Sequence, residues 1–286
     1  MAEATTSEYA VGEFPGLEAR QYHQDLPHYG RSQIVTALRS PAHLKASLDR
    51  PTKVTPAMNL GTAIHTAVLE PELFDEEIAF MPEGMDRRTK AGKEAYATFM
   101  EEHAGMAILP HADKQLVEDV AAAVTAAPAS KLFLGAEAQR ENSYLWVDGQ
   151  TGLPLKCRPD LFIPERKMLV DLKTTTDARP EAFSQSIAKF GYHIQAAHYL
   201  NGVNAVLGPD TVRHFVFLAV EKEPPYGVLI GALDAEDVER GMEACRRGIN
   251  RIAWCLENDK WPGYSSKVHR LSLPNWARKR MDEGDD

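Results

Sequence analysis

Two aspartates and a lysine interrupt the apolar residues of the segment "PLKCRPDLFIPERKMLVDLKTTT" (154–176). Asp160 and Asp171 offer the hard oxygen ligands that Mg²⁺ prefers, and this cation often needs only one or two carboxylates from the protein. Lys173, two residues beyond Asp171, could orient or deprotonate an attacking water, or stabilise charge that develops on a phosphate. These residue types and their spacing suit metal-assisted hydrolysis of a phosphodiester.

The alternation of residue types predicts that this segment forms two antiparallel strands joined by the loop 164–167. In that register Asp160 faces Asp171, and Arg158 faces Lys173. Carboxylates opposed at about 5 Å repel each other, so they must share a proton, be neutralised by a cationic side chain or bind a metal ion. The other face of the hairpin is predicted to be apolar and to consist of Cys157, Leu161, Ile163, Met168, Val170 and Leu172.

A simpler interpretation is a partly exposed hairpin whose polar face carries balanced charges. Both short motifs recur in this chain, because Glu165-Arg166-Lys167 repeats the acid-x-lysine spacing and Pro209-Asp210 repeats the proline–aspartate pair. These two copies lie in predicted turns. Only Asp160 and the tripeptide 171–173 fall in strands that face each other.

The composition is ordinary for a soluble globular protein, with 44% hydrophobic and 26% charged residues in a chain of 286. The net charge of −9 argues only weakly against nucleic-acid binding, because an acidic protein can be basic along one groove. The segment "DRRTKAGK" (86–93) is locally basic. Three cysteines without a Cys-x-x-Cys spacing argue against a disulfide framework, a zinc knuckle and an iron–sulfur cluster. No apolar run is long enough to cross a bilayer and no secretory signal is evident, so no membrane association and a cytoplasmic location are expected.

The periodicity predicts an α/β protein whose first 130 residues are mostly helical. From residue 130 onward the expected order is β-β-β-α-α-β-β-α, ending in a long helix over about 235–258. The C-terminal stretch is expected to be irregular, with a disordered acidic tail and with Trp261, Tyr264 and Trp276 as packing residues. Helices are expected over 33–39 with Ser32 as the cap, 41–48, 58–70, about 88–104 and about 111–127.

Several ordered blocks of the sequence resemble the phage and prophage exonuclease VIII (RecE-type) family of the PD-(D/E)xK nuclease superfamily. The resemblance covers about residues 30 to 277, and its signature is Pro159-Asp160 followed by Asp171-Leu172-Lys173. It implies a PD-(D/E)xK (restriction-endonuclease-like) core with a mixed central sheet flanked by helices, plus a mainly helical N-terminal region. The expected parts are an extension over 1–30, a helical region over 31–130 that packs on the core and supplies His65, the nuclease core over 131–260 and a C-terminal segment over 261–286. The blocks are "LGTAIHTAVLEP" (60–71), "DRRTKAGKEAY" (86–96), "KCRPDLF" (156–162), "VDLKTT" (170–175), "GYHIQAAHY" (191–199), "WPGYS" and "LSLPNWA".

The resemblance also implies roles for individual residues. Asp160, Asp171 and Lys173 would be catalytic, and Gln195 and Tyr199 would join them as the Q-x-x-x-Y motif, which lies on one helix face. The expected metal ligands are His65, Asp160, Asp171 and the carbonyl of Leu172, with Glu141 as a possible additional acid. Contacts to DNA are expected from Arg87, Arg88, Lys90, Lys93 and Arg158. Each of these assignments has a purely structural alternative. His65 could be an interior histidine, Gln195 and Tyr199 could cap a buried face, and the basic residues of 87–93 could be a solvated helix start.

The function implied by the resemblance is Mg²⁺-dependent exonuclease activity, with Mn²⁺ able to substitute. The enzyme would degrade linear double-stranded DNA from its ends, 5′ to 3′, and leave a 3′ single strand for recombination. A RecT-type single-strand annealing protein would be its partner, and a ring-shaped homo-oligomer would surround the DNA with basic groups while its outer surface stayed acidic. The alternatives are an endonuclease or junction resolvase with the same fold, and a catalytically inactive DNA-binding relative.

Overall fold

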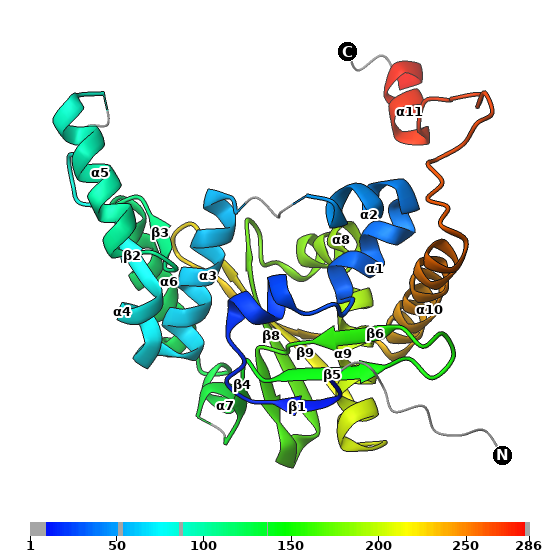
Figure 1. Ribbon diagram of the computed structural model, residues 1–286. Helices are drawn as coiled ribbons and strands as arrows, with labels where there is room; N and C mark the ends of the chain where they lie inside the picture. Colours follow the sequence, from blue (N-terminus) through cyan, green and yellow to red (C-terminus); the bar gives the residue numbers. More distant parts are fainter. Residues whose placement is uncertain (1–9, 51–53, 86–87, 136, 284–286) are drawn as a thin grey trace.

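The computed structural model describes residues 10–50, 54–85, 88–135 and 137–283. A mixed five-stranded sheet lies at the centre of this described chain, in the order β10-β9-β8-β7-β4 (Figure 1). Its middle strand, β8, is antiparallel to β7 and parallel to β9. The α/β class and the mixed sheet flanked by helices are therefore confirmed. The strands of this sheet are β4 (Gln139–Arg140), β7 (Leu161–Ile163), β8 (Met168–Thr175), β9 (His214–Glu221) and β10 (Val228–Ala232).

Two smaller sheets accompany the central one. Their strands in the N-terminal half were not expected, because a segment of three residues is too short to establish a period of two. One sheet is antiparallel and contains β1 (Gly12–Phe14), β5 (Ser143–Val147) and β6 (Pro154–Cys157). The other is parallel and pairs β2 (Ile78–Phe80) with β3 (Ala107–Leu109).

The predicted helices begin and end close to the expected positions, except that Gly30 and not Ser32 is the N-cap of α1. The short helices α4 and α7 were not predicted. Proline occupies the first turn of α2, α3 and α8, where its missing N–H has no intrahelical partner to lose. The last stretch differs from the prediction, since it contains α11 where irregular chain was expected. The helices are α1 (Arg31–Arg39), α2 (Pro41–Leu48), α3 (Pro56–Leu69), α4 (Phe74–Glu77), α5 (Lys90–Glu102), α6 (Asp113–Ala126), α7 (Lys131–Leu134), α8 (Pro180–Phe190), α9 (Tyr192–Leu207), α10 (Ala235–Asn258) and α11 (Asn275–Glu283).

Both faces of the central sheet are buried. Side chains alternate along β8, so Leu169 packs in the hydrophobic core with α1, α9 and α10, whereas Val170 and Leu172 pack in the core with α3 and α6. Figure 1 shows these helices on the two sides of the sheet, with α5 projecting away from it. The polar residues of β8 therefore lie beneath a layer of helices. Among the described residues, no helix is long and apolar enough to cross a membrane.

The close approach of α10 to α9 depends on Gly241. A β-carbon at this position would overlap the carbonyl oxygen of His193 and would lie 2.9 Å from the β-carbon of Ala197. Both atoms belong to the rigid part of α9, so a change of rotamer cannot relieve the overlap. We expect Gly241→Ala to lower the free energy of unfolding by roughly 3 kcal/mol in urea denaturation. The matched variant Gly61→Ala, whose β-carbon would meet no atom within 4 Å, should leave it unchanged or raise it slightly; equal stability of the two variants would contradict the packing argument.

Candidate active site

The predicted strand over 154–163 is interrupted between β6 and β7, at residues 158–160. Pro159 has no backbone N–H and cannot extend the strand ladder. The pairing of β7 with β8 keeps the predicted register, with Leu161 opposite Val170. Beyond the end of β7, the backbone N–H of Leu172 donates a hydrogen bond to Oδ2 of Asp160 at 2.6 Å. The interruption thus turns the Asp160 carboxylate onto the middle strand of the sheet.

The prediction that Arg158 faces Lys173 is wrong, because the interruption directs Arg158 elsewhere. Its Nε donates to the hydroxyl of Ser143 at 2.8 Å and its Nη2 donates to the carbonyl of Leu17 at 2.6 Å. Its guanidinium also lies 4.3 Å from the ring centroid of Tyr22. The interruption also makes the prediction for Cys157 wrong. Cys157 packs in the core beneath α9 and not on the face of the sheet that carries Leu172.

The Asp171 carboxylate is held between two side chains. Asp171 is fully buried, its Oδ1 accepts a hydrogen bond of 2.6 Å from Nε2 of Gln195 on α9, and its Oδ2 contacts the amine of Lys173. Asp171 and Lys173 are two residues apart on β8, so both side chains project toward α9. The structure therefore brings together Asp171, Lys173 and Gln195 as the resemblance implied.

A second group of side chains converges on Asp160 from two other elements. His65 on α3, Glu141 after β4 and Asp160 each offer one ligand atom, and these three atoms lie within 4.8 Å of one another. The Nδ1 of His65 lies 3.5 Å from Oδ2 of Asp160. Glu141 has a left-handed backbone with a φ of 47°, which is strained for a residue other than glycine, and its N–H donates to the carbonyl of Asp160 at 3.1 Å. The geometry therefore places Glu141, the possible additional acid of the resemblance, beside His65 and Asp160.

The carboxyl groups of the site have raised pKa values. Burial raises the pKa of Asp160 to about 6 and that of Asp171 to about 6, although Lys173 acts in the opposite direction on both. Burial also raises the pKa of Glu141 well above its ordinary range, and the neighbouring Asp160 carboxylate raises it further. Burial therefore makes the ionised form of all three carboxyl groups costly, and Lys173 offsets this only in part for Asp160 and Asp171.

His65 and Lys173 have opposite protonation states. Burial and the nearby ammonium of Lys173 lower the pKa of His65 to about 4, so at neutral pH its contact with Asp160 is not an ion pair and the ring is in the neutral form that binds metals. Burial alone would lower the pKa of Lys173, but Asp171 and Asp160 more than offset this and raise it. Lys173 is thus an ammonium group in this arrangement, which suits charge stabilisation better than proton abstraction.

The donor set fits a divalent cation. A neutral imidazole and two carboxylates at these separations match the mixed nitrogen and oxygen ligands of such ions, and a bound cation would relieve the repulsion among the carboxylates. The backbone of Leu172 adjoins this group, because its N–H donates to Asp160 and its presence partly offsets the lowering of the His65 pKa. Of the residues implied by the resemblance, this group contains His65, Asp160 and the possible additional acid Glu141. Asp171 lies next to this group, engaged by Lys173 and Gln195.

The raised carboxyl pKa values predict how pH controls metal binding. Asp160 binds protons more tightly in the folded chain than when unfolded, so without metal the stability should fall as pH rises from about 4 to about 6. A cation competes with those protons. We expect Mn²⁺ to raise the melting temperature at pH 7.5, by an amount equivalent to about 2.7 kcal/mol at one hundred times its Kd, and to have little effect at pH 5. Thermal unfolding by circular dichroism at both pH values measures this, and an equal shift at pH 5 and pH 7.5 would contradict it.

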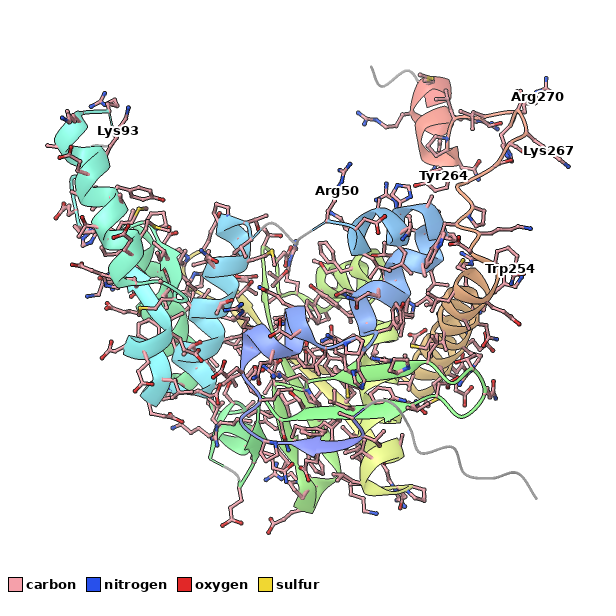
Figure 2. All side chains as sticks on the ribbon, in the orientation of Figure 1. Arg50, Lys93, Trp254, Tyr264, Lys267 and Arg270 are labelled. Atoms are coloured by element: carbon pink, nitrogen blue, oxygen red, sulfur yellow. The ribbon has the colours of Figure 1, made fainter. Side chains whose placement is uncertain are left out.

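The other predicted residues occupy two regions. Tyr199 packs on Phe215 with ring centroids 6.2 Å apart, and its pKa is raised by burial, by Tyr22 and by the Asp171 carboxylate, which places the phenol near the site. The described basic residues of the block 86–93 are exposed at or just before the start of α5, whose projecting end carries Lys93 (Figure 2). Lys90 forms an exposed ion pair with Glu94 there, at 3.9 Å. Arg88 is also exposed, and Arg87 lies outside the described residues.

Tyr192 is a neighbour of the site that the sequence reasoning missed. The amine of Lys173 lies 5.2 Å from the centroid of the Tyr192 ring, and the guanidinium of Arg31 lies 5.7 Å from it. A cation above an aromatic face is attracted by the ring, so Tyr192 helps to orient Lys173. The sequence did contain a signal for this residue. Tyr192 lies three residues before Gln195 on α9, so the two side chains share one helix face.

The comparison with protein-family models agrees with this geometry. The model for the PDDEXK-like domain of unknown function (DUF3799) matches residues 30–274. The chain belongs to this family. As in the expectation from sequence, the DUF3799 chain has a PD-(D/E)xK core. The comparison with curated proteins gives no match.

One solved structure supports the fold of this DUF3799 chain. A "Putative exonuclease" from Eubacterium rectale is similar with a TM-score of 0.58 and 11% identity, over 92% of this chain and 97% of that chain. This similarity supports the arrangement of sheet and helices. A phage related exonuclease from Haemophilus somnus 129PT is 13% identical over 74% of this chain and 99% of that chain, with a TM-score of 0.33.

Proposed function

We propose that this protein is a metal-dependent exodeoxyribonuclease that degrades linear double-stranded DNA from its ends, 5′ to 3′, leaving a 3′ single strand. The observation that carries the proposal is the convergence of Asp160, Asp171 and Lys173 with His65 and Glu141 on a PD-(D/E)xK core. The name of the similar solved structure from Eubacterium rectale, "Putative exonuclease", also supports it. The choice of DNA ends, the polarity and the role in recombination rest on the sequence resemblance to the RecE-type family.

Each residue has a task that follows from its contacts. His65, Glu141 and Asp160 would hold a divalent cation, for which Mg²⁺ is the proposed ion and Mn²⁺ a substitute. When bound, such a cation polarises a phosphoryl oxygen and lowers the pKa of a coordinated water. Lys173, as an ammonium, would stabilise negative charge on the phosphate, and Gln195 fixes the Asp171 carboxylate that holds Lys173.

Digestion of two DNA substrates tests the proposal. We expect 5′-end-labelled linear duplex to be degraded in the presence of Mg²⁺, and covalently closed circular duplex of the same sequence to stay intact. EDTA should abolish the reaction. Cutting of the closed circle would favour an endonuclease or junction resolvase instead, and metal uptake without any cleavage would favour an inactive DNA-binding relative.

The proposed product suggests the proposed partners. A 3′ single strand is the substrate of a RecT-type annealing protein, and a ring-shaped homo-oligomer would keep the enzyme on its DNA. In such a ring the basic groups would face the DNA while the excess of acidic groups faced the solvent. Sedimentation velocity with and without linear duplex measures the assembly, and a monomer under both conditions would exclude the ring.

A further inference from the structure

The segment from Lys260 to Met281 has a charge opposite to that of the whole chain. It contains no aspartate or glutamate, while the complete chain has a net charge of −9. Figure 2 shows Lys267 and Arg270 on the loop between α10 and α11. The basic residues of the segment are Lys260, Lys267, Arg270, Arg278, Lys279 and Arg280.

A groove of about 500 Å³ lies at the base of this segment, between α10 and the junction of α1 and α2. Two arginines and two aromatic side chains take part in its lining: Arg39, Arg251, Trp254 and Tyr264. Trp254 is 46% exposed and Tyr264 is 71% exposed. The prediction that the C-terminal aromatics are packing residues is therefore wrong for Tyr264, although Trp261 does pack against the core. The side chain of Trp276 lies outside the described residues.

Hydrogen bonds hold the walls of the groove in place. Nε of Arg39 donates to the Tyr264 hydroxyl at 2.9 Å, and the N–H of Ala42 donates to the carbonyl of Pro262 at 3.1 Å. Nη1 of Arg251 donates to two carbonyls in the last turn of α1, at 3.1 and 3.0 Å. The groove is thus preformed by contacts between α1, α2, α10 and the C-terminal segment, and a ligand would not have to assemble it.

We infer that this groove and the segment Lys260–Met281 bind single-stranded DNA. Exposed aromatic rings beside arginines are the features that stack unpaired bases and contact phosphates. A duplex would not expose its base faces to Trp254 and Tyr264, so the aromatic pair selects a single strand. The six basic residues beyond the groove extend the positive charge over more than one nucleotide. The site shares no residue with the Asp160 centre, and strand binding goes beyond the proposed function without depending on it.

Fluorescence anisotropy with a labelled oligothymidylate of twenty nucleotides, in EDTA to prevent cleavage, tests the inference. Trp254→Ala and Tyr264→Ala should each weaken binding about tenfold, because stacking of one base on one ring has about that effect. Tyr264→Phe keeps the ring and loses only the hydrogen bond from Arg39, so it should bind more tightly than Tyr264→Ala does. Leu256→Ala, at an equally exposed position of α10, is the matched control and should leave the affinity unchanged.

The charged part of the segment has its own readout. The double variant Lys267→Ala/Arg270→Ala should reduce the slope of log affinity against log salt by about 1.4, since each single-strand phosphate contact contributes about 0.7. An unchanged slope would remove the segment from the binding surface. Displacement of the oligonucleotide by an equal concentration of thymidine monophosphate would overturn the strand proposal in favour of a mononucleotide site.

Two further outcomes separate this inference from its competitors. If Trp254→Ala and Tyr264→Ala abolish self-association in sedimentation velocity without changing oligonucleotide affinity, the groove is covered by a second copy and the inference fails. If the chain binds the oligonucleotide through the groove but never digests duplex, the proposed nuclease function fails and the inference stands. If it digests duplex while both aromatic variants bind the oligonucleotide normally, only the inference fails.

Discussion

Replacement of Lys173 by methionine is expected to lower the rate of DNA hydrolysis by about two to three orders of magnitude, the effect of removing one preorganised donor to developing charge. Lys173 is the ammonium group held by Asp171 and adjacent to Asp160, and its amine lies over the Tyr192 ring. Methionine keeps the length of the side chain and removes the charge. Single-turnover digestion of end-labelled linear duplex at saturating protein measures the chemical step apart from binding.

Two variants serve as controls for this result. Lys167 is the lysine of the other acid-x-lysine sequence. Its side chain is half exposed and its amine lies 2.9 Å from the Asp210 carboxylate. Lys167→Met should therefore leave the activity unchanged. Lys173→Arg keeps a cation beside the buried carboxylates, so it should preserve the fold that a charge-free residue could disturb. Its planar fork cannot reproduce the position of the amine, and it should remain nearly inactive. A Lys173→Met protein that digests DNA at the original rate would remove this residue from the mechanism.

The parts of the site that the sequence predicted correctly depend on local geometry. The alternation of side chains and the length of the loop 164–167 fix the β7–β8 register, so Leu161 pairs with Val170 as expected. The helix over 58–70 follows from its apolar period and from the proline after it, which places His65 one turn before the end of α3. The strand with Asp171 and the helix with Gln195 were both predictable from their periods, and in the structure the two side chains are hydrogen-bonded.

The parts that the sequence could not predict depend on contacts between distant segments. Arg158 leaves the hairpin because Leu17 and Tyr22, more than a hundred residues earlier, supply a carbonyl and a ring for it. Glu141 enters the site through a left-handed turn, a conformation that a glutamate does not signal in sequence. Because Phe162 and Leu169 face α9 in the core, the second face of the hairpin is also buried. Periodicity distinguishes apolar from polar faces, but it does not reveal that a helix will cover a polar one.

Asp160→Asn is expected to abolish binding of Mn²⁺ in isothermal titration. The carboxylate of Asp160 is the ligand that contacts the other members of the group, since it lies beside His65 and Glu141 and accepts the N–H of Leu172. An amide at this position keeps the size of the side chain and can offer only a weaker, uncharged oxygen to the cation. Loss of one acidic ligand from a site with so few donors should weaken affinity at least a hundredfold, about 2.7 kcal/mol.

Asp210→Asn is the matched control, because Asp210 belongs to the other proline–aspartate pair of the chain. Its carboxylate is exposed and paired with Lys167 and Arg213, so the substitution should leave Mn²⁺ binding unchanged. Asparagine also tolerates the left-handed backbone found there. Glu141→Gln then separates the two possible ligand sets. If Glu141 is a ligand, this variant should lose metal affinity as Asp160→Asn does, whereas full affinity would leave the cation to His65, Asp160 and Asp171 as the sequence resemblance implied.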